Sequence, residues 1–382
     1  MLKSEELQEL CDYQVVHPAP ESFASSDVTP RVLYSRVFSV GAAVSAITLF
    51  SAMSIQSPQA MAKSEKNSDL IKGDFSEVLN SLRSGTAEPT TTNVQLQLKQ
   101  YSVKSNGVDR YYYVHIPPTY NGRTPTPLVL AFHGAAGHAR AMPQLTGLNK
   151  CSDKHSFIVV YPEGLNSRWN DGVGGKTKPE LEDIDFVRLL LTQINSQYKI
   201  DKSRIYSAGM SNGGFFSQYL SINMPNTFAA LASISASLEE PTYRKLKPQQ
   251  PISILFVHGD DDDVVPFNGG SIGVAGALDE KTPRKATSAA QAVGYWVKSN
   301  QCKDIPLIQN IPDAKPNDGT HAVRKVYSGG KNGTEVIFIA IQNGGHTWPS
   351  GWQYLPESIV GKTSRGVNAS EEIWNLFQRH HL

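Results

Sequence analysis

An α/β fold with a mostly parallel central sheet is predicted by two features of this sequence. Short apolar runs typical of buried strands recur along the chain, at 128–132, 157–161, 205–209, 229–235, 252–257 and 335–341. Stretches with helical periodicity alternate with them, most clearly at 185–198, 288–299 and 370–380. Strands that alternate with helices form a sheet covered by helices on both faces, and such sheets bind ligands at the carboxyl ends of their strands.

The sheet is expected to begin with an antiparallel hairpin. Apolar and polar side chains alternate over residues 94–101, and Asn106-Gly107 is a strong signal for a two-residue hairpin turn. The second strand of this hairpin is predicted at 111–116. Its three consecutive tyrosines are interpreted as aromatic packing on a strand and not as a binding stripe.

Domain organisation follows from length and composition. The chain has 382 residues, of which 40% are hydrophobic and 19% are charged, with a formal net charge of +1. We expect one catalytic domain at 94–382, an N-terminal extension at 1–62 and a flexible linker at 63–93 that is rich in Ser, Thr, Lys and Glu. No basic stripe suggests a nucleic-acid partner.

The extension carries a charge-free apolar segment at 37–55, followed by Ala60-Met61-Ala62, which is typical of a secretory cleavage site. The protein is therefore expected to be extracellular or periplasmic. A membrane anchor is the alternative, because the 36 residues that precede the apolar segment are more than the polar N-terminal region of a signal peptide usually has. An uncleaved segment of this kind would be the chain's only expected contact with a membrane.

The chain has three cysteines. Cys11 precedes the export segment and would be lost on cleavage. Cys151 and Cys302 are interpreted as two unrelated buried thiols, with a disulfide in an oxidising compartment as the alternative. No cluster of His, Cys and Asp has zinc-like spacing, so neither a catalytic metal nor another cofactor is expected.

Ser211 lies in Gly209-Met210-Ser211-Asn212-Gly213, between the strand at 205–209 and a helix-like stretch at 215–220. In this strand-turn-helix context, G-x-S-x-G predicts a nucleophile elbow, a sharp turn that holds a serine hydroxyl above the end of a sheet. The pentapeptide alone is weak, since it also occurs by chance. Its significance depends on an acid and a histidine that follow later in the chain.

Two later strands end in loops that supply these groups. The strand at 252–257 leads into His258-Gly259 and four consecutive aspartates, and the strand at 335–341 leads into a loop with His346. The order serine, acid, histidine, each after a strand, predicts a catalytic triad in which Ser211 attacks and His346 is the general base. Asp262 is the expected acid, because His-Gly-x-x-Asp-x-x-Val-Pro is the usual spacing, and Asp263 is the alternative.

An oxyanion loop is predicted after the strand at 128–132, where the sequence continues His133-Gly134-Ala135-Ala136-Gly137. The backbone N–H groups of Ala135 and Asn212 are the expected donors to a tetrahedral intermediate, and Ala136 is the alternative to Ala135. His133 is interpreted as structural, because this kind of site has one base and it comes last in the chain.

Together these segments resemble the secreted α/β-hydrolase family that groups feruloyl esterases, acetylxylan esterases and polyhydroxybutyrate-depolymerase-like esterases. The resemblance covers residue 94 to the C-terminus and rests on 111–118, 133–134, 161–164, 169–170, 209–214, 264–270 and 344–349. A tail match at 353–356, 363–365 and 374 points to the depolymerase-like branch. The resemblance implies an α/β-hydrolase fold and a serine carboxylesterase. It implies as substrates polyester oligomers of the 3-hydroxybutyrate type, or feruloyl or acetyl side-chain esters of plant polysaccharides.

The chain departs from the family pattern at two places. Pro349-Ser350-Gly351 stands where the family often has Pro-Gly-Gly. Cys302 matches a family cysteine that often pairs with another just before the last strand, but the stretch 325–335 contains no cysteine, so the family's disulfide is expected to be absent.

Three residues are candidates for substrate contact. Trp169 and Asn170 belong to a Gly-rich loop at 164–175, which either forms a pocket wall or is a loop held down by a buried tryptophan. Trp348 either lines the cleft or braces the loop of His346.

Two other classes of function stay open. The first is a non-catalytic polymer-binding module, which the complete triad and oxyanion loop argue against. The second is a serine peptidase or acyltransferase, which uses the same triad and which the fold alone does not exclude.

Overall fold

The computed structural model describes residues 98–172, 182–245, 247–273, 284–314 and 316–382, which all belong to one compact unit. The expected extension at 1–62, with its apolar segment and Cys11, and the expected linker at 63–93 lie outside these residues. No helix in the described part of the chain is both long and apolar enough to cross a membrane.

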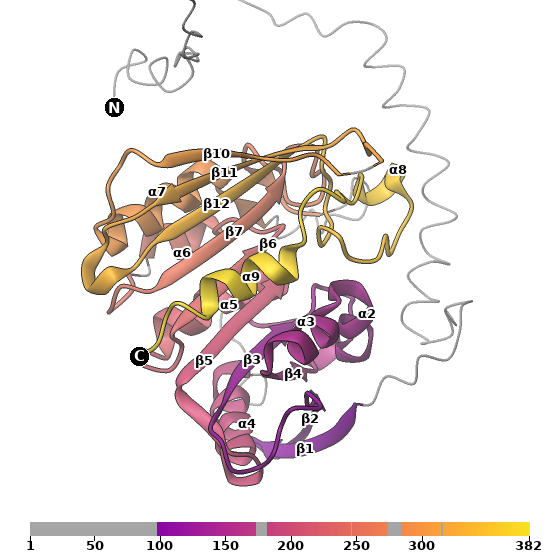
Figure 1. The fold of residues 1–382 in the computed structure, drawn as a ribbon, viewed down its shortest axis with the longest axis vertical. Helices are drawn as coiled ribbons and strands as arrows, with labels where there is room; N and C mark the ends of the chain where they lie inside the picture. The colour runs from indigo at the N-terminus through magenta and orange to yellow at the C-terminus, as the bar shows by residue number, and fades with distance from the viewer. Residues whose placement is uncertain (1–97, 173–181, 246, 274–283, 315) are drawn as a thin grey trace, which may run out of the picture. The chain divides into compact units, whose positions relative to one another are not determined.

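A ten-stranded mixed sheet lies at the centre of the unit, in the order β1-β2-β4-β3-β5-β6-β7-β12-β11-β10 (Figure 1). The strands from β4 to β12 in this order run parallel, and an antiparallel hairpin extends the sheet at each edge. The bounds are β1 Lys99–Ser105, β2 Val108–His115, β3 Thr126–Phe132, β4 Ile158–Pro162, β5 Ile200–Met210, β6 Ala230–Ile234, β7 Ser253–Gly259, β10 Leu307–Ile311, β11 His321–Tyr327 and β12 Val336–Gln342. The mostly parallel sheet predicted from the sequence is confirmed.

The hairpin at the first edge was expected, and the one at the other edge was not. Asn106 and Gly107 connect β1 to β2 with φ angles of 48° and 85°, the left-handed backbone that this turn requires. At the opposite edge, β10 pairs with β11. Its apolar residues do not alternate with polar ones and most of the strand is exposed, so no strand pattern marked it in the sequence.

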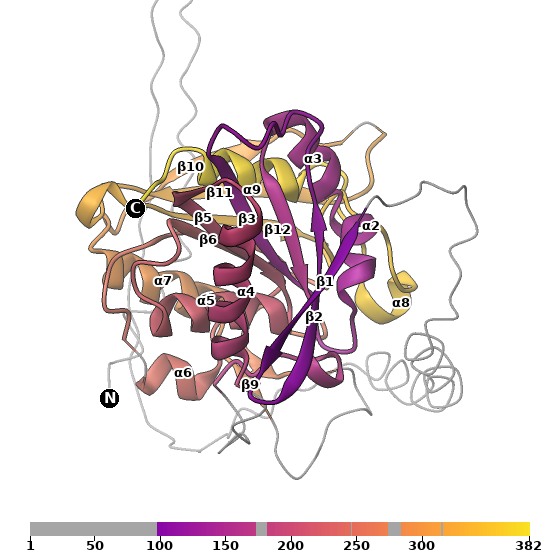
Figure 2. The ribbon, with the colours of Figure 1, turned by 90° about the horizontal axis from the view of Figure 1, so that it is seen from below.

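Helices cover both faces of the sheet. Figure 2 shows α4, α5 and α7 on one side and α3 and α9 on the other. The helix bounds are α2 Met142–Thr146, α3 Leu148–His155, α4 Asp183–Gln197, α5 Asn212–Asn223, α6 Glu240–Lys245, α7 Ala289–Asn300, α8 Glu357–Val360 and α9 Ala369–Phe377. Two short strands, β8 Gly270–Ser271 and β9 Lys285–Ala286, form a separate ladder.

Polar caps explain where two of the predicted helices begin. Ser288 and Gln291 form a capping box at α7, in which the Ser288 hydroxyl accepts the Gln291 N–H and the Gln291 side chain accepts the Ser288 N–H. At α9, the side chain of Asn368 accepts the N–H of Glu371 at 3.2 Å.

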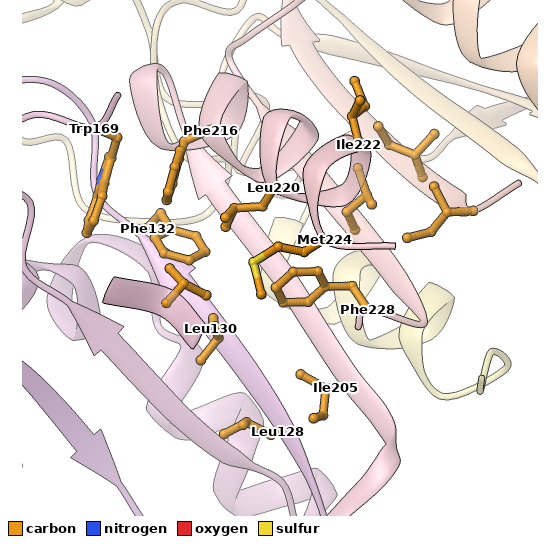
Figure 3. Close-up of a cluster of buried hydrophobic side chains, with 14 of the residues drawn as sticks. Leu128, Leu130, Phe132, Trp169, Ile205, Phe216, Leu220, Ile222, Met224 and Phe228 are labelled. Atoms are coloured by element: carbon orange, nitrogen blue, oxygen red, sulfur yellow. The ribbon is translucent and has the colours of Figure 1, made fainter. Parts of the chain in front are cut away.

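Two hydrophobic cores lie on the two faces of the sheet. Along β3, Leu128, Leu130 and Phe132 face the core under α4, α5 and α7, and the alternate residues face the core under α3 and α9. Figure 3 shows Leu130 and Phe132 packed against Phe216 and Leu220 of α5. Cys302 lies in the first core and Cys151 in the second. Both thiols are free and buried, as expected for two unrelated cysteines.

Candidate active site

Ser211 occupies a strained turn between β5 and α5. Its backbone angles, φ 55° and ψ −125°, lie outside the regions that L-residues normally adopt, so neighbouring structure must hold them in place. The glycines on either side make the turn possible. A Cβ at Gly209 would lie 2.2 Å from the carbonyl oxygen of Gly213, and one at Gly213 would lie 2.3 Å from that of Phe132. The Ser211 N–H donates to the carbonyl of Ile234 on the neighbouring β6 at 2.9 Å.

Asp262 and His346 meet in the loops after β7 and β12. Nδ1 of His346 lies 2.9 Å from Oδ2 and 3.1 Å from Oδ1 of Asp262. Both side chains are buried. The N–H groups of Val264 and Val265 donate to Oδ1 of the carboxylate at 2.9 and 2.8 Å. Burial acts to raise the pKa of Asp262, but His346 and His258 outweigh it and hold that pKa well below its usual range. The carboxylate is therefore ionised and fixed in orientation.

Only one of the four consecutive aspartates has this environment. Asp260, Asp261 and Asp263 are exposed, and Asp260 accepts the N–H of Asn343 at 2.7 Å. Burial and the neighbouring Asp261 and Asp262 raise the pKa of Asp263. The structure thus brings Asp262, and not the alternative Asp263, to the imidazole.

Ser211 and His346 both lie at the carboxyl ends of the parallel strands. The loop after β6 contacts the segments that carry them. Besides the bond from Ser211 to Ile234, the hydroxyl of Ser235 donates to the carbonyl of Thr347 at 3.0 Å. Within the described residues, the Ser211 hydroxyl makes no hydrogen bond, and the imidazole ring of His346 makes hydrogen bonds only through Nδ1. Nε2 is thus the ring nitrogen left for a serine or a substrate, and such contacts often tighten only when substrate binds.

The His133–Gly137 loop passes beside the serine. A Cβ added to Gly134 would lie 3.2 Å from Cβ and 3.8 Å from Oγ of Ser211. The Ala136 N–H donates to Ser167 at 2.8 Å, so it is not available to an oxyanion. The N–H groups of Ala135 and Asn212 have no partner within the described residues.

His133 is buried and serves the loop itself. Its Nε2 accepts the N–H of Gly164 at 2.9 Å, and its Nδ1 lies 2.8 Å from the carbonyl oxygen of Gly134. Burial lowers the pKa of His133, although Glu163 acts in the opposite direction. A neutral ring with its proton on Nδ1 satisfies both contacts, which agrees with a structural role.

Trp169 and Trp348 are buried, which does not fit direct contact with a substrate. Trp169 is 1% exposed, stacks on Phe216 (Figure 3), and donates from Nε1 to the carbonyl of His133 at 3.0 Å. Trp348 is 0% exposed and donates to the hydroxyl of Ser370 at 3.2 Å. Burial favours the second of the two interpretations given for each tryptophan: Trp169 holds down its own loop and contacts the predicted oxyanion loop, and Trp348 braces the loop of His346. Asn170 is partly exposed, and its N–H donates to Asp183 at 2.7 Å.

An ionic network behind the serine was not anticipated from the sequence. The side chain of Asn212 donates to Oδ2 of Asp171 at 2.7 Å, and Arg284 contacts the same oxygen at 2.5 Å. Arg284 also contacts Glu239, which is buried like Asp171. These residues are far apart in the chain, so no local motif connects them.

One group of side chains in the described part has metal-ligating types. Cys151, His155 and Glu371 place their ligand atoms within 4.8 Å of one another, between α3 and α9. Glu371 already binds His155 at 2.8 Å and Lys154 at 3.1 Å, and Cys151 donates to the carbonyl of Ser370. The group therefore has a structural explanation as a polar link between two helices.

Comparisons with known proteins identify relatives of the chain. The family model for esterase PHB depolymerase matches residues 111–240. The protein named "Putative esterase NocK" from Nocardia uniformis subsp. tsuyamanensis is 30% identical over 275 residues, which are 69% of this chain and 78% of that protein. Feruloyl esterase B from Piromyces equi is 28% identical over 253 residues, and the match covers 64% of this chain but 44% of that protein.

Solved structures of esterases also align with the chain. An acetyl xylan esterase from Aspergillus awamori does so with a TM-score of 0.46 and 15% sequence identity, over 65% of this chain and 94% of that one. A thermostable esterase aligns with a TM-score of 0.47 and 17% identity, over 75% of this chain and 63% of that one.

The protein is a serine carboxylic-ester hydrolase with the α/β-hydrolase fold. It belongs to the family of esterases that includes feruloyl esterases, acetylxylan esterases and polyhydroxybutyrate-depolymerase-type esterases.

Proposed function

We propose that Ser211, His346 and Asp262 carry out ester hydrolysis through an acyl-enzyme. Oγ of Ser211 attacks the acyl carbon while Nε2 of His346 takes its proton, and the protonated imidazole then gives that proton to the departing alcohol. Water attacks the acyl-enzyme in the same way and releases the acid. The observation that supports this most is the hydrogen bond between Asp262 and Nδ1 of His346, because it directs Nε2 outward and stabilises the imidazolium.

The oxyanion is assigned to the backbone N–H groups of Ala135 and Asn212. Two findings support them: both groups lack a partner in the described residues, and the loop of Ala135 passes within contact distance of Ser211. Fixed donors directed at the developing charge are usually the largest single source of acceleration in acyl transfer.

The substrates proposed are soluble oligomers of 3-hydroxybutyrate type or feruloyl or acetyl side-chain esters of polysaccharides. The supporting observations are the names of the relatives, which include feruloyl esterase B and a bifunctional acetylxylan esterase/xylanase. One panel tests this: kcat/KM for methyl ferulate, acetylated xylan and a 3-hydroxybutyrate oligomer. A peptide and an acyl-acceptor alcohol belong in the same panel, since faster turnover of either would favour the peptidase or acyltransferase alternative.

Labelling separates this function from that of a binding module. A fluorophosphonate should modify wild type at Ser211, found by mass spectrometry of the peptide, and should not modify Ser211→Ala. A folded protein that stays unlabelled and hydrolyses none of the esters would contradict the proposal.

We also propose that residues 94–382 form the catalytic domain of a secreted protein, with residues 1–62 as the export segment and 63–93 as a linker. The sequence around 37–55 and 60–62 supports this. N-terminal sequencing of protein recovered from the medium or periplasm should give a start shortly after residue 62. An intact N-terminus in the membrane fraction would indicate the anchor instead.

A further inference from the structure

His258 touches the acid of the proposed triad from the side opposite His346. It lies near the end of β7 and is 2% exposed. Its Nε2 is 2.9 Å from the carbonyl oxygen of Val265 and 3.3 Å from Oδ2 of Asp262. Both neighbours of Nε2 are hydrogen-bond acceptors, so this nitrogen carries the proton. Phe267 packs edge-on against the ring at 5.6 Å.

The other ring nitrogen bears on which nitrogen carries the ring proton. Nδ1 of His258 is buried and has no hydrogen-bond partner among the described residues. Leaving an unprotonated Nδ1 without a hydrogen bond costs little free energy. A proton on Nδ1, in contrast, would make it a buried donor without an acceptor. Of the two tautomers, the geometry thus selects the one with the proton on Nε2.

We propose that His258 is a positioning residue: its Nε2–H, which donates to the carbonyl of Val265, also lies 3.3 Å from Oδ2 of Asp262 and so limits how strongly that carboxylate attracts the proton of His346. This inference rests on the proposed function of the Asp262–His346 pair. Oδ1 of Asp262 is held by two backbone N–H groups, whereas Oδ2 has only the two histidines. Without His258, the charge on Oδ2 would act on His346 alone.

Among the described residues, Asp262 forms ion pairs with His258 and His346 and with no Lys or Arg. Within the described residues, the charged neighbours of Asp262 on its own loop are Asp260, Asp261 and Asp263. From the loop after β12, Tyr354 donates to the carbonyl of His346 at 3.0 Å. Burial and Asp262 raise its pKa, so the phenol stays protonated.

Loss of the donor should change the pH dependence of the reaction. A carboxylate with one fewer hydrogen bond stabilises the imidazolium more strongly, so the neutral base is reached only at higher pH. The acid limb of kcat/KM should shift to higher pH. At the optimum, kcat should fall about tenfold, as for other partners that orient a functional group, while KM stays unchanged.

The experiment compares His258→Leu with His258→Gln. Glutamine places an amide N–H near the position of the imidazole Nε2 and should restore the wild-type limb, whereas leucine should not. His115→Leu is the matched control: Nε2 of His115 is 2.7 Å from Asp153 and its Nδ1 is buried without a partner, but it pairs with Val159 at the opposite edge of the sheet. It should lose stability without a shift of the limb.

A wild-type limb in His258→Leu, or the same shift in His115→Leu, would overturn the proposal. If His258→Leu does not fold, ¹⁵N NMR of the wild-type histidines decides: His258 must be neutral with its proton on Nε2, and a cation or the other tautomer overturns the inference. Failure of the proposed function itself is seen separately, as activity that survives Ser211→Ala.

Discussion

The side-chain amide of Asn212 pairs with both backbone groups of Trp169. Its Oδ1 accepts the Trp169 N–H at 2.7 Å, and its Nδ2 donates to the Trp169 carbonyl at 3.1 Å. Asn212 is the residue after the proposed nucleophile and begins α5. The indole N–H of Trp169 donates a hydrogen bond to the carbonyl of His133. The side chain of Asn212 therefore fastens the serine turn to the loop after β4, and the indole of Trp169 connects that loop to the one after β3.

Asn212→Ala should destabilise the protein and lower kcat. The change leaves two buried backbone groups of Trp169 unpaired, which costs about 1–3 kcal/mol of unfolding free energy. It also frees the backbone N–H proposed as an oxyanion donor to move. Urea denaturation and kinetics measure both effects. Asn310→Ala on the exposed strand β10 is the control and should stay within about 0.5 kcal/mol of wild type. An equal effect of the two changes would argue against the cross-link.

Ser211→Ala should abolish ester hydrolysis and preserve the fold. Knock-outs of such nucleophiles lower kcat by about 10⁶, because the covalent route is lost. The hydroxyl of Ser211 makes no hydrogen bond in the described part of the structure, so circular dichroism and the melting temperature should change little. Ser196→Ala, on the exposed face of α4, is the control for the substitution itself. Near-normal turnover by folded Ser211→Ala would show that another residue attacks.

Asp262→Asn should lower kcat by about 10⁴, because an amide cannot hold the imidazole in the required tautomer as a carboxylate does. Asp263→Asn and Asp261→Asn should be nearly silent, since both side chains are exposed. Measuring kcat for the three variants at one pH is sufficient. If Asp263→Asn were the damaging change, the loop after β7 would have to be wound differently from the structure.

Much of the site could be predicted because its candidate catalytic residues lie in short sequence motifs. The glycines around Ser211 and the spacing from His258 to Asp262 are fixed by backbone geometry within a few residues. The order of the strands that carry Ser211, Asp262 and His346 follows from the parallel sheet. The same local logic predicted the hairpin at Asn106-Gly107.

The rest could not be predicted because it depends on contacts between distant segments. Arg284 reaches Asp171 across 113 positions of sequence. Trp169 is buried, and no sequence motif distinguishes a buried tryptophan from an exposed one. His258 belongs to the His-Gly-x-x-Asp pattern in the sequence, and only the structure gives its distances to Val265 and Asp262, on which its proposed role depends. β10 was not predicted because it is an exposed edge strand in which apolar and polar residues do not alternate.

Acid should destabilise the protein through His133. Burial lowers its pKa in the folded state, while the unfolded chain keeps a value of about 6.5. The unfolded state thus binds the extra proton first, so this contribution to stability is complete above about pH 6.5 and is lost as the pH falls through the lower folded value. His133→Gln cannot titrate, and its Oε1 can still accept the N–H of Gly164. The difference in unfolding free energy between wild type and His133→Gln should therefore shift against wild type between about pH 7 and pH 5, measured by urea denaturation. A constant difference would mean that folding does not change the pKa of His133, and one that favours wild type at the lower pH would mean that folding raises it; either result would contradict the neutral ring that accepts the N–H of Gly164.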